Sequence, residues 1–162
     1  MMGTRSGAVD PGLVLHLIRE RGLSPDAVAD FLYVRSGLLG VSGISDDVGV
    51  LEASGDPRAA EALDLFVYRV VREAGSLVAA LGGLDALMFT AGIGERSPRM
   101  RAAIAAGLAA FGVALDPARN ATAETCIGWV GSRAAAYVVP ANEELPIAWA
   151  VVRFLTGAVT RG

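Results

Sequence analysis

Lysine is absent from this sequence of 162 residues, and all 14 basic residues are arginines. Without lysine, the chain cannot form a Walker-type phosphate-binding loop, a Schiff base or a lysine general base. The sequence has a single histidine, His16, and a single cysteine, Cys126, which makes nucleophilic Ser/His and Cys/His sites unfavoured. One cysteine also excludes an internal disulfide. The remaining reactive groups are carboxylates, guanidinium groups, hydroxyls and the backbone. This inventory suits phosphoryl transfer.

Long apolar runs and basic clusters are also missing. The longest run without a charged residue spans 102–115, which is too short for a membrane span and is interrupted by glycines. A net charge of −3 without a basic cluster argues against binding to nucleic acid. No charged segment followed by an apolar one opens the chain, so we expect a cytoplasmic location. With 53% hydrophobic and 19% charged residues, the composition is that of one globular domain.

Hydrophobic spacing and capping residues predict an α/β fold. Helices are predicted over 11–21, 24–35, 57–81, 98–111 and 143–155. Short apolar runs predict strands at 86–90 and 134–139, and the second should form a hairpin with 126–130. The three glycines of 36–45 predict a loop. We expect a sheet with few strands, flanked by the helices at 57–81, 98–111 and 143–155.

The predicted helix at 57–81 is the longest and is apolar over much of its circumference. Its apolar residues recur at spacings of three and four, and Leu65 and Val71 broaden the stripe. Arg69, Arg72 and Glu73 exclude a membrane span. A helix of this kind is either central to the fold or shared with a second subunit, because so large an exposed apolar patch promotes association.

The stretch from Asp85 to Ser97 is the centre of the sequence. A short buried strand at 86–90 ends at Gly92 and Gly94, and Ser97 with Pro98 predicts the start of a helix. Glycines let backbone N–H groups approach a ligand closely, so a strand, a glycine loop and a helix start together suit a nucleotide. The same pattern is also typical of ordinary β–α connections.

Other polar residues allow two interpretations. His16 has no carboxylate or cysteine three or four residues away to orient it, which favours a packing or surface role over catalysis. Asp46 and Asp47 suit a metal or a ribose, but also a loop or a helix cap. Glu143 and Glu144 fall in the first turn of a helix, where acidic residues stabilise the macrodipole without any further role.

Four stretches in a fixed order are more specific than any one of them: MGTRSG at 2–7, LLGVSGIS at 38–45, FTAGIGE at 89–95 and NEELPIA at 142–148. Together they resemble the C-terminal part of the acetokinase family, which comprises acetate, propionate and butyrate kinases. This resemblance implies the actin-like, sugar-kinase-like (ribonuclease H-like) ATPase fold. Residues 1–162 would form its C-terminal nucleotide-binding lobe, incomplete at the N-terminal side.

The resemblance implies transfer of a phosphoryl group between ATP and a short-chain carboxylate, giving an acyl phosphate and ADP, with Mg²⁺ as cofactor. The arginine of GTRSG carries over to Arg5, whose guanidinium would neutralise charge on the transferring group. The first glutamate of the NEEL block supports magnesium in the family, and this role carries over to Glu143. The family also implies a homodimer formed through the C-terminal lobe.

The family's nucleotide site carries over to two segments. The loop matching FTAGIGE receives adenosine, which assigns Gly92, Ile93, Gly94 and Glu95 to nucleotide binding. The aspartate after GVSGIS contributes to the same site and corresponds to Asp47.

Three positions depart from the family pattern. Gly49 stands where an arginine on the nucleotide side is usual, Arg96 replaces the asparagine after GIGE, and Ala141 replaces the threonine before NEE. The first two bear on affinity for ATP. Arg96 would restore a positive charge near the phosphates.

The family's N-terminal lobe supplies a catalytic histidine, a second arginine, an aspartate and much of the carboxylate pocket, and none of these matches a residue here. We therefore expect an acetate kinase fragment that is inactive alone. The alternatives are a non-catalytic remnant that binds nucleotide or dimerises, and an unrelated α/β domain with another ligand. The sequence does not distinguish acetate from propionate or butyrate.

Overall fold

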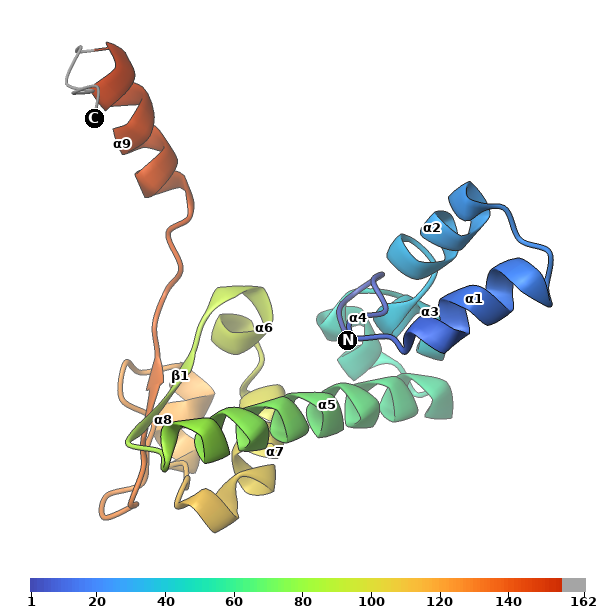
Figure 1. Ribbon diagram of the computed structural model, residues 1–162. Coiled ribbons are helices and arrows are strands. Elements are labelled where there is room, and N and C mark those ends of the chain that lie inside the picture. Colours follow the sequence, from blue (N-terminus) through green and yellow to red (C-terminus); the bar gives the residue numbers. More distant parts are fainter. Residues whose placement is uncertain (156–162) are drawn as a thin grey trace.

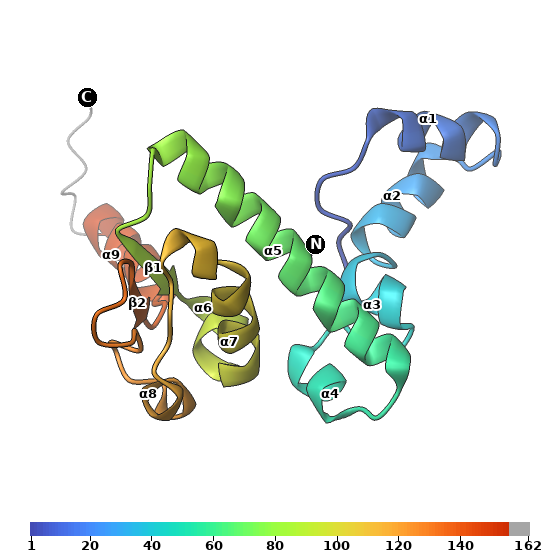
Figure 2. The same cartoon turned by 90° about the horizontal axis from the view of Figure 1, so that it is seen from below.

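The computed structural model describes residues 1–155 of the chain, a mixed α/β structure organised along one long helix (Figure 1). This helix, α5 (Pro57–Leu81), has its N-terminal half beside α3 and α4 and its C-terminal half beside the sheet and α7 (Figure 2). Residues 156–162, the end of the predicted 1–162 lobe, lie outside the described residues.

Two short helices form the N-terminal corner of the molecule. In α1 (Pro11–Arg19), the N-cap Asp10 accepts a hydrogen bond from the N–H of Gly12, and in α2 (Pro25–Tyr33) Ser24 does the same for Ala27. Both helices were predicted from the sequence and are confirmed. His16 is exposed on α1, in agreement with a surface role.

The predicted loop at 36–45 is wrong, because α3 (Gly37–Ser42) lies within it. The first amides of α3 donate to backbone carbonyls of the N-terminal loop: the N–H of Leu38 to Met2 and that of Leu39 to Gly3. These bonds replace a side-chain cap and stabilise a helix that its glycines disfavour. Gly37 has a φ of +65°, and a Cβ there would lie 2.2 Å from the Met2 carbonyl oxygen, so only glycine fits.

Helix α4 (Val48–Ala53) follows. Helix α5 lies between the N-cap Asp56 and Gly82, which is left-handed, so its predicted bounds of 57–81 are confirmed. The N-terminal half of α5 packs into a core cluster of Leu38, Val48, Leu51, Ala59, Ala62, Leu63 and Met100. Its C-terminal half borders a second cluster, made of Phe89, Ile104, Ala105, Leu108, Val113, Ile127, Ala134, Ala136 and Val138. The long helix is thus central, and it joins two cores.

Within residues 1–155, the sheet has two strands, β1 (Ala86–Phe89) and β2 (Ala135–Val138), paired in parallel with Ala86 opposite Ala135. Both predicted strands and the small size of the sheet are confirmed. The predicted hairpin is present only in part. Cys126 forms an isolated antiparallel bridge with Tyr137, and the N–H groups of Ile127 and Gly128 both donate to the Ala136 carbonyl, so 126–130 does not continue as a regular strand.

Between the strands, the chain forms α6 (Ala91–Arg96), α7 (Pro98–Gly107), a 3₁₀ turn (Ala109–Phe111) and α8 (Pro117–Thr122). The predicted helix at 98–111 is therefore divided near Leu108. After β2, an extended segment leads to α9 (Glu144–Leu155), which stands apart from the other elements in Figure 1. All its described side chains are exposed. Among the described helices, none has the length and apolar content that crossing a membrane requires.

Candidate functional site

A polar recess of about 490 Å³ lies at the C-terminal ends of the two parallel strands. It is lined by α6 on one side and by the segment before α9 on the other, through Ala91, Gly92, Glu95, Arg96 and residues 141–144. Ligands of open α/β sheets bind outside the carboxyl ends of the strands, which is where this recess lies. It is therefore the candidate site, and we call it the strand-end recess.

One hydrogen bond joins the two walls of the strand-end recess. Oε1 of Glu95 accepts from the backbone N–H of Ala141 at 2.8 Å, although the two residues are 46 positions apart. Asn142 follows Ala141 directly, and its Oδ1 accepts from the N–H of Leu145, at the start of α9. The bond from Ala141 to Glu95 holds the segment that carries Glu143 against α6, and the bond from Leu145 to Asn142 shapes the start of α9.

The glycine segment itself is helical, contrary to the predicted loop. Gly92 faces open space, whereas a Cβ at Gly94 would lie 3.1 Å from the carbonyl carbon of Phe89. Gly94 therefore allows α6 to pack closely on the end of β1. Ile93 is half-buried against the core cluster around Leu38. Ala91 adopts a φ of +59° although it is not glycine, and such strained residues concentrate at functional sites.

Ser97 joins α6 and α7 to the first part of the chain. Its Oγ accepts from the N–H of Met100, as the predicted N-cap should, and donates to Oε1 of Glu52 at 2.6 Å. Glu52 lies on α4, five residues after Asp47. The helix that Asp47 caps is thereby tied to the start of α7.

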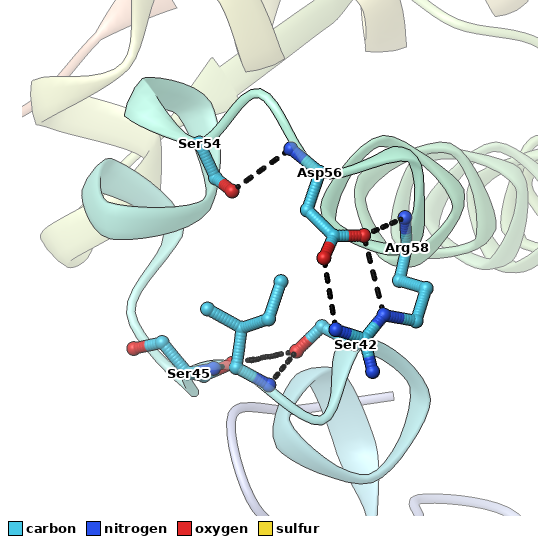
Figure 3. A network of polar contacts seen from close by, with 6 residues as sticks. Ser42, Ser45, Ser54, Asp56 and Arg58 are labelled. Carbon is cyan, nitrogen blue, oxygen red and sulfur yellow. Dashed lines mark hydrogen bonds and ion pairs between the residues drawn. The ribbon is translucent and has the colours of Figure 1, made fainter.

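Residues 42–45, which precede Asp47 in the chain, form a hydrogen-bonded turn (Figure 3). The buried Ser42 hydroxyl accepts from the backbone N–H groups of Ile44 and Ser45, which shapes the turn, and Oδ1 of Asp47 then caps α4 by accepting from Val50. The cap interpretation of Asp47 is thus satisfied in the structure. One of its oxygens has this role, and the side chain remains exposed.

An ion pair lies beside this turn (Figure 3). Nη2 of Arg58 donates to Oδ2 of Asp56 at 2.8 Å, and Nε donates to Oδ1 at 3.2 Å. The side-chain hydrogen bond from Arg58 lowers the pKa of Asp56 to about 2. This pair keeps a positive group close to Gly43, since Nη1 of Arg58 would lie 3.6 Å from a Cβ at that glycine.

Arg5 lies elsewhere, in the N-terminal loop. Its side chain is exposed, with its guanidinium 6.0 Å from the centre of the Tyr33 ring. The loop itself lies against the first aspartate of the pair, because a Cβ at Gly3 would be 3.2 Å from the Cβ of Asp46. Among the four sequence stretches, 2–7 is hydrogen-bonded to 38–45, and 89–95 lines the recess together with 142–148. Ile93 also packs against the core cluster that contains Leu38.

The strand-end recess brings together Gly92, Glu95 and Glu143 of the predicted site residues. Ile93 and Gly94 face the protein interior, and Arg5 and Asp47 do not line the recess. Sequence reasoning missed Glu52 and Arg101, both of which support α6 and α7 through hydrogen bonds. No local pattern marks them, since their partners are distant in the sequence or lie on the backbone.

A dedicated metal cage is absent from residues 1–155, where no three His, Cys, Asp or Glu side chains are grouped to hold an ion. Mg²⁺ nevertheless keeps several waters and takes one or two carboxylates together with substrate phosphates. The carboxylates of Glu143 and Glu144 border the strand-end recess and fit this kind of partial ligand set.

Comparison with known proteins identifies the architecture. A family model described as the acetokinase family matches residues 1–149. The chain belongs to the acetokinase family. It is 56% identical over 147 residues to the acetate kinase of Nitrobacter hamburgensis, an alignment that covers 91% of this chain and 36% of that enzyme. It is 50% identical to the acetate kinase of Rhodopseudomonas palustris, over 97% of this chain and 40% of the relative.

Solved structures of the acetokinase family have the same fold. The crystal structure of Porphyromonas gingivalis acetate kinase matches 96% of this chain with a TM-score of 0.86 at 35% identity, and 40% of that chain is covered. A propionate kinase from Francisella tularensis matches 91% of this chain with a TM-score of 0.83 at 38% identity, over 38% of its own length. The chain thus spans about two fifths of its relatives and forms a partial lobe of the actin-like kinase fold.

Proposed function

We propose that this chain is the nucleotide-binding part of an acetate kinase-type phosphotransferase, which converts ATP and a short-chain carboxylate to ADP and an acyl phosphate. The observation that carries the proposal is the strand-end recess, where Gly92, Glu95 and Glu143 meet from segments about 50 residues apart. We also propose that the protein acts in the cytoplasm.

We assign a separate role in nucleotide binding to each of these residues. Gly92 leaves the mouth of the recess open for the nucleotide, because nothing lies within 4 Å of where its Cβ would be. Glu95 holds the opposite wall through Ala141. Asp47 would contact the nucleotide with the oxygen that does not cap α4, and Ile93 and Gly94 shape the adenosine side from behind.

Mg²⁺ would be supported by Glu143 and would neutralise charge on the phosphates. Arg96 borders the same recess and adds a positive charge in place of the family's asparagine. Arg5 is exposed, so its guanidinium is free to reach a carboxylate or phosphoryl group brought by the rest of an enzyme.

We expect no useful turnover from the chain alone. Phosphoryl transfer needs both reactants held in line and charge neutralised from several sides, and one missing positioned donor costs about 10²–10³ in rate. The test is a hydroxamate assay for acetyl phosphate, on the purified chain alone and mixed with a separately produced N-terminal lobe of the Nitrobacter hamburgensis enzyme. Activity only in the mixture supports the proposal. Activity near that of a full-length relative from the chain alone would contradict it.

A binding assay tests the nucleotide site independently of turnover. A fluorescent ATP analogue with Mg²⁺ should bind weakly, and Glu143→Gln should remove the Mg²⁺ dependence of binding. The control is Glu61→Gln on α5, an exposed carboxylate that does not line the recess, and it should retain that dependence. Equal effects of the two substitutions would argue against a specific role for Glu143.

A non-catalytic remnant that binds nucleotide or forms a dimer is the second candidate. Gly49 and Arg96 favour it, because both depart from the family at the nucleotide site. The mixing assay separates the two candidates, since a remnant stays inactive with any N-terminal lobe.

Dimer formation is proposed through α5. Its exposed apolar residues, Leu65, Tyr68, Leu77 and Leu81, would be covered by a second copy. Sedimentation equilibrium at tens of micromolar should give a dimer, and Leu77→Glu should shift it to monomer. A wild-type monomer at that concentration would contradict this part of the proposal.

A further inference from the structure

Arg101 is a buried cation that lacks a counter-ion among the residues that the structure describes. Its relative exposure is 1%, and burial lowers its pKa below the usual value for arginine. Among residues 1–155, no carboxylate forms an ion pair with it. Burying a guanidinium group is costly unless other groups compensate its charge and accept its hydrogen bonds.

Those groups are carbonyl and amide oxygens. Nη1 donates to the backbone carbonyls of Gly94 and Glu95, at 2.9 Å each. Nε donates to Oδ1 of Asn120 at 2.7 Å, and Nη2 donates to the Asn120 carbonyl. The side chain of Asn120 is fixed in turn, because its Nδ2 donates to the carbonyl of Pro98 at 2.9 Å.

The contacts with Gly94 and Glu95 fall at the C-terminal end of α6. Carbonyls there have no partner within the helix, and a positive charge at a helix C-terminus is favourable. Six residues with two glycines are too few to be helical without outside support. Arg101 supplies that support from α7, and its planar guanidinium can contact both carbonyls and Asn120 at once.

We propose that Arg101 is a positioning residue that, with Asn120, fixes α6 so that Gly92 and Glu95 face the strand-end recess. Through Glu95 the effect extends to the opposite wall, since Glu95 binds the backbone of Ala141. The effect of Arg101 on ligand binding rests on the proposed nucleotide site. Its effect on the order of α6 does not depend on that site.

Amide hydrogen exchange, measured by mass spectrometry on the full chain without ligand, tests the order of α6. Arg101→Met should accelerate exchange in peptides covering 90–97 by about tenfold or more, because hydrogen bonds from a charged donor are lost. Arg101→Lys retains the charge but cannot make the forked contact, so its acceleration should be intermediate. The control is Ile127→Ala, which removes a fully buried side chain of the other core cluster and should act mainly outside 90–97.

Acceleration confined to 90–97 and graded from lysine to methionine supports the proposal. Acceleration there no greater than in the Ile127→Ala control overturns it. If Arg101→Met unfolds the chain, Arg101→Lys decides, and uniform acceleration across all peptides would make Arg101 a general core residue instead.

The affinity for a fluorescent ATP analogue with Mg²⁺, measured on the same variants, separates this inference from the proposed function. Affinity should fall in the order wild type, Arg101→Lys, Arg101→Met, and remain unchanged in Ile127→Ala. A wild-type chain that does not bind the analogue would refute the nucleotide site, while the exchange data would still decide the role of Arg101.

Discussion

Oγ of Ser97 donates a 2.6 Å hydrogen bond to Oε1 of Glu52, a residue 45 positions earlier in the chain. The same oxygen accepts from the N–H of Met100, so one hydroxyl caps α7 and ties it to α4. Ser97 is buried and Glu52 is half-buried, so water competes little for this bond. It connects the helix capped by Asp47 with the glycine segment of the strand-end recess.

Ser97→Ala should therefore destabilise the chain by about 2–3 kcal/mol, because it removes a cap and leaves a half-buried carboxylate without its donor. Glu52→Gln keeps an acceptor for the hydroxyl and should cost about 1 kcal/mol or less. The measurement is urea unfolding followed by circular dichroism. Ser24→Ala, which removes only the cap of α2, is the control at about 1 kcal/mol. Equal losses in Ser97→Ala and Ser24→Ala would show that the bond to Glu52 contributes nothing.

Gly37→Ala should be strongly destabilising. The new Cβ would lie 2.2 Å from the Met2 carbonyl oxygen, in a left-handed conformation. The clash separates α3 from the loop that carries Arg5, and we expect a loss of about 3 kcal/mol or more in urea unfolding. Gly55→Ala is the matched control, because its Cβ meets nothing within 4 Å, and it should be neutral or slightly stabilising. Similar results for the two variants would contradict the packing of the N-terminal loop on α3.

Asp56 should make stability depend on pH in the acid range. The hydrogen bond from Arg58 lowers the pKa of Asp56 from the ordinary value of 3.8 to about 2 in the folded chain. A carboxyl group whose pKa is lower in the folded than in the unfolded chain stabilises the fold at pH values above the unfolded pKa. That contribution disappears as pH falls from about 4 to about 2. Wild type should be more stable than Asp56→Asn at pH 7, with the difference shrinking steadily below pH 4. A difference that does not vary with pH would show that the ion pair contributes no pH dependence.

Gly49→Arg should strengthen binding of the ATP analogue with Mg²⁺ by about tenfold, because a guanidinium would again be available for the nucleotide, as in the family pattern. Gly49 is exposed, and the new Cβ would meet only Oδ1 of Asp47, at 3.1 Å, which a small shift accommodates. Gly49→Ala is the control, since it adds the Cβ without the charge and should leave affinity unchanged. Equal affinities of the two variants would place the nucleotide away from α4.

Local signals predicted much of the fold. Asp10, Ser24, Asp56 and Ser97 accept hydrogen bonds from amides two or three residues ahead, and Gly82 ends α5 in the left-handed conformation. Each of these interactions is completed within a few residues, which is why the residue type and its place beside an apolar run were sufficient. The four family stretches likewise predicted the fold and its partial extent.

The sequence failed where distant groups decide local structure. The glycines near Gly37 and Gly94 favour loops, yet both segments are helical, because carbonyls of Met2 and Gly3 accept from the first amides of α3 and Arg101 donates to the last carbonyls of α6. The strand-end recess was likewise predictable only in its local parts. The separate segments were predicted from the family pattern, but the contact of Glu95 with Ala141 that joins them has no local signature.

The exposure of Trp129 and Trp149, at 55% and 58%, has a practical consequence for spectroscopy. These are the chain's two tryptophans, and indole rings in contact with water emit at long wavelength whether a protein is folded or not. Intrinsic fluorescence will therefore change little when urea unfolds the chain. Its emission will instead shift to shorter wavelength whenever the apolar surface of α9 around Trp149 is shielded from water.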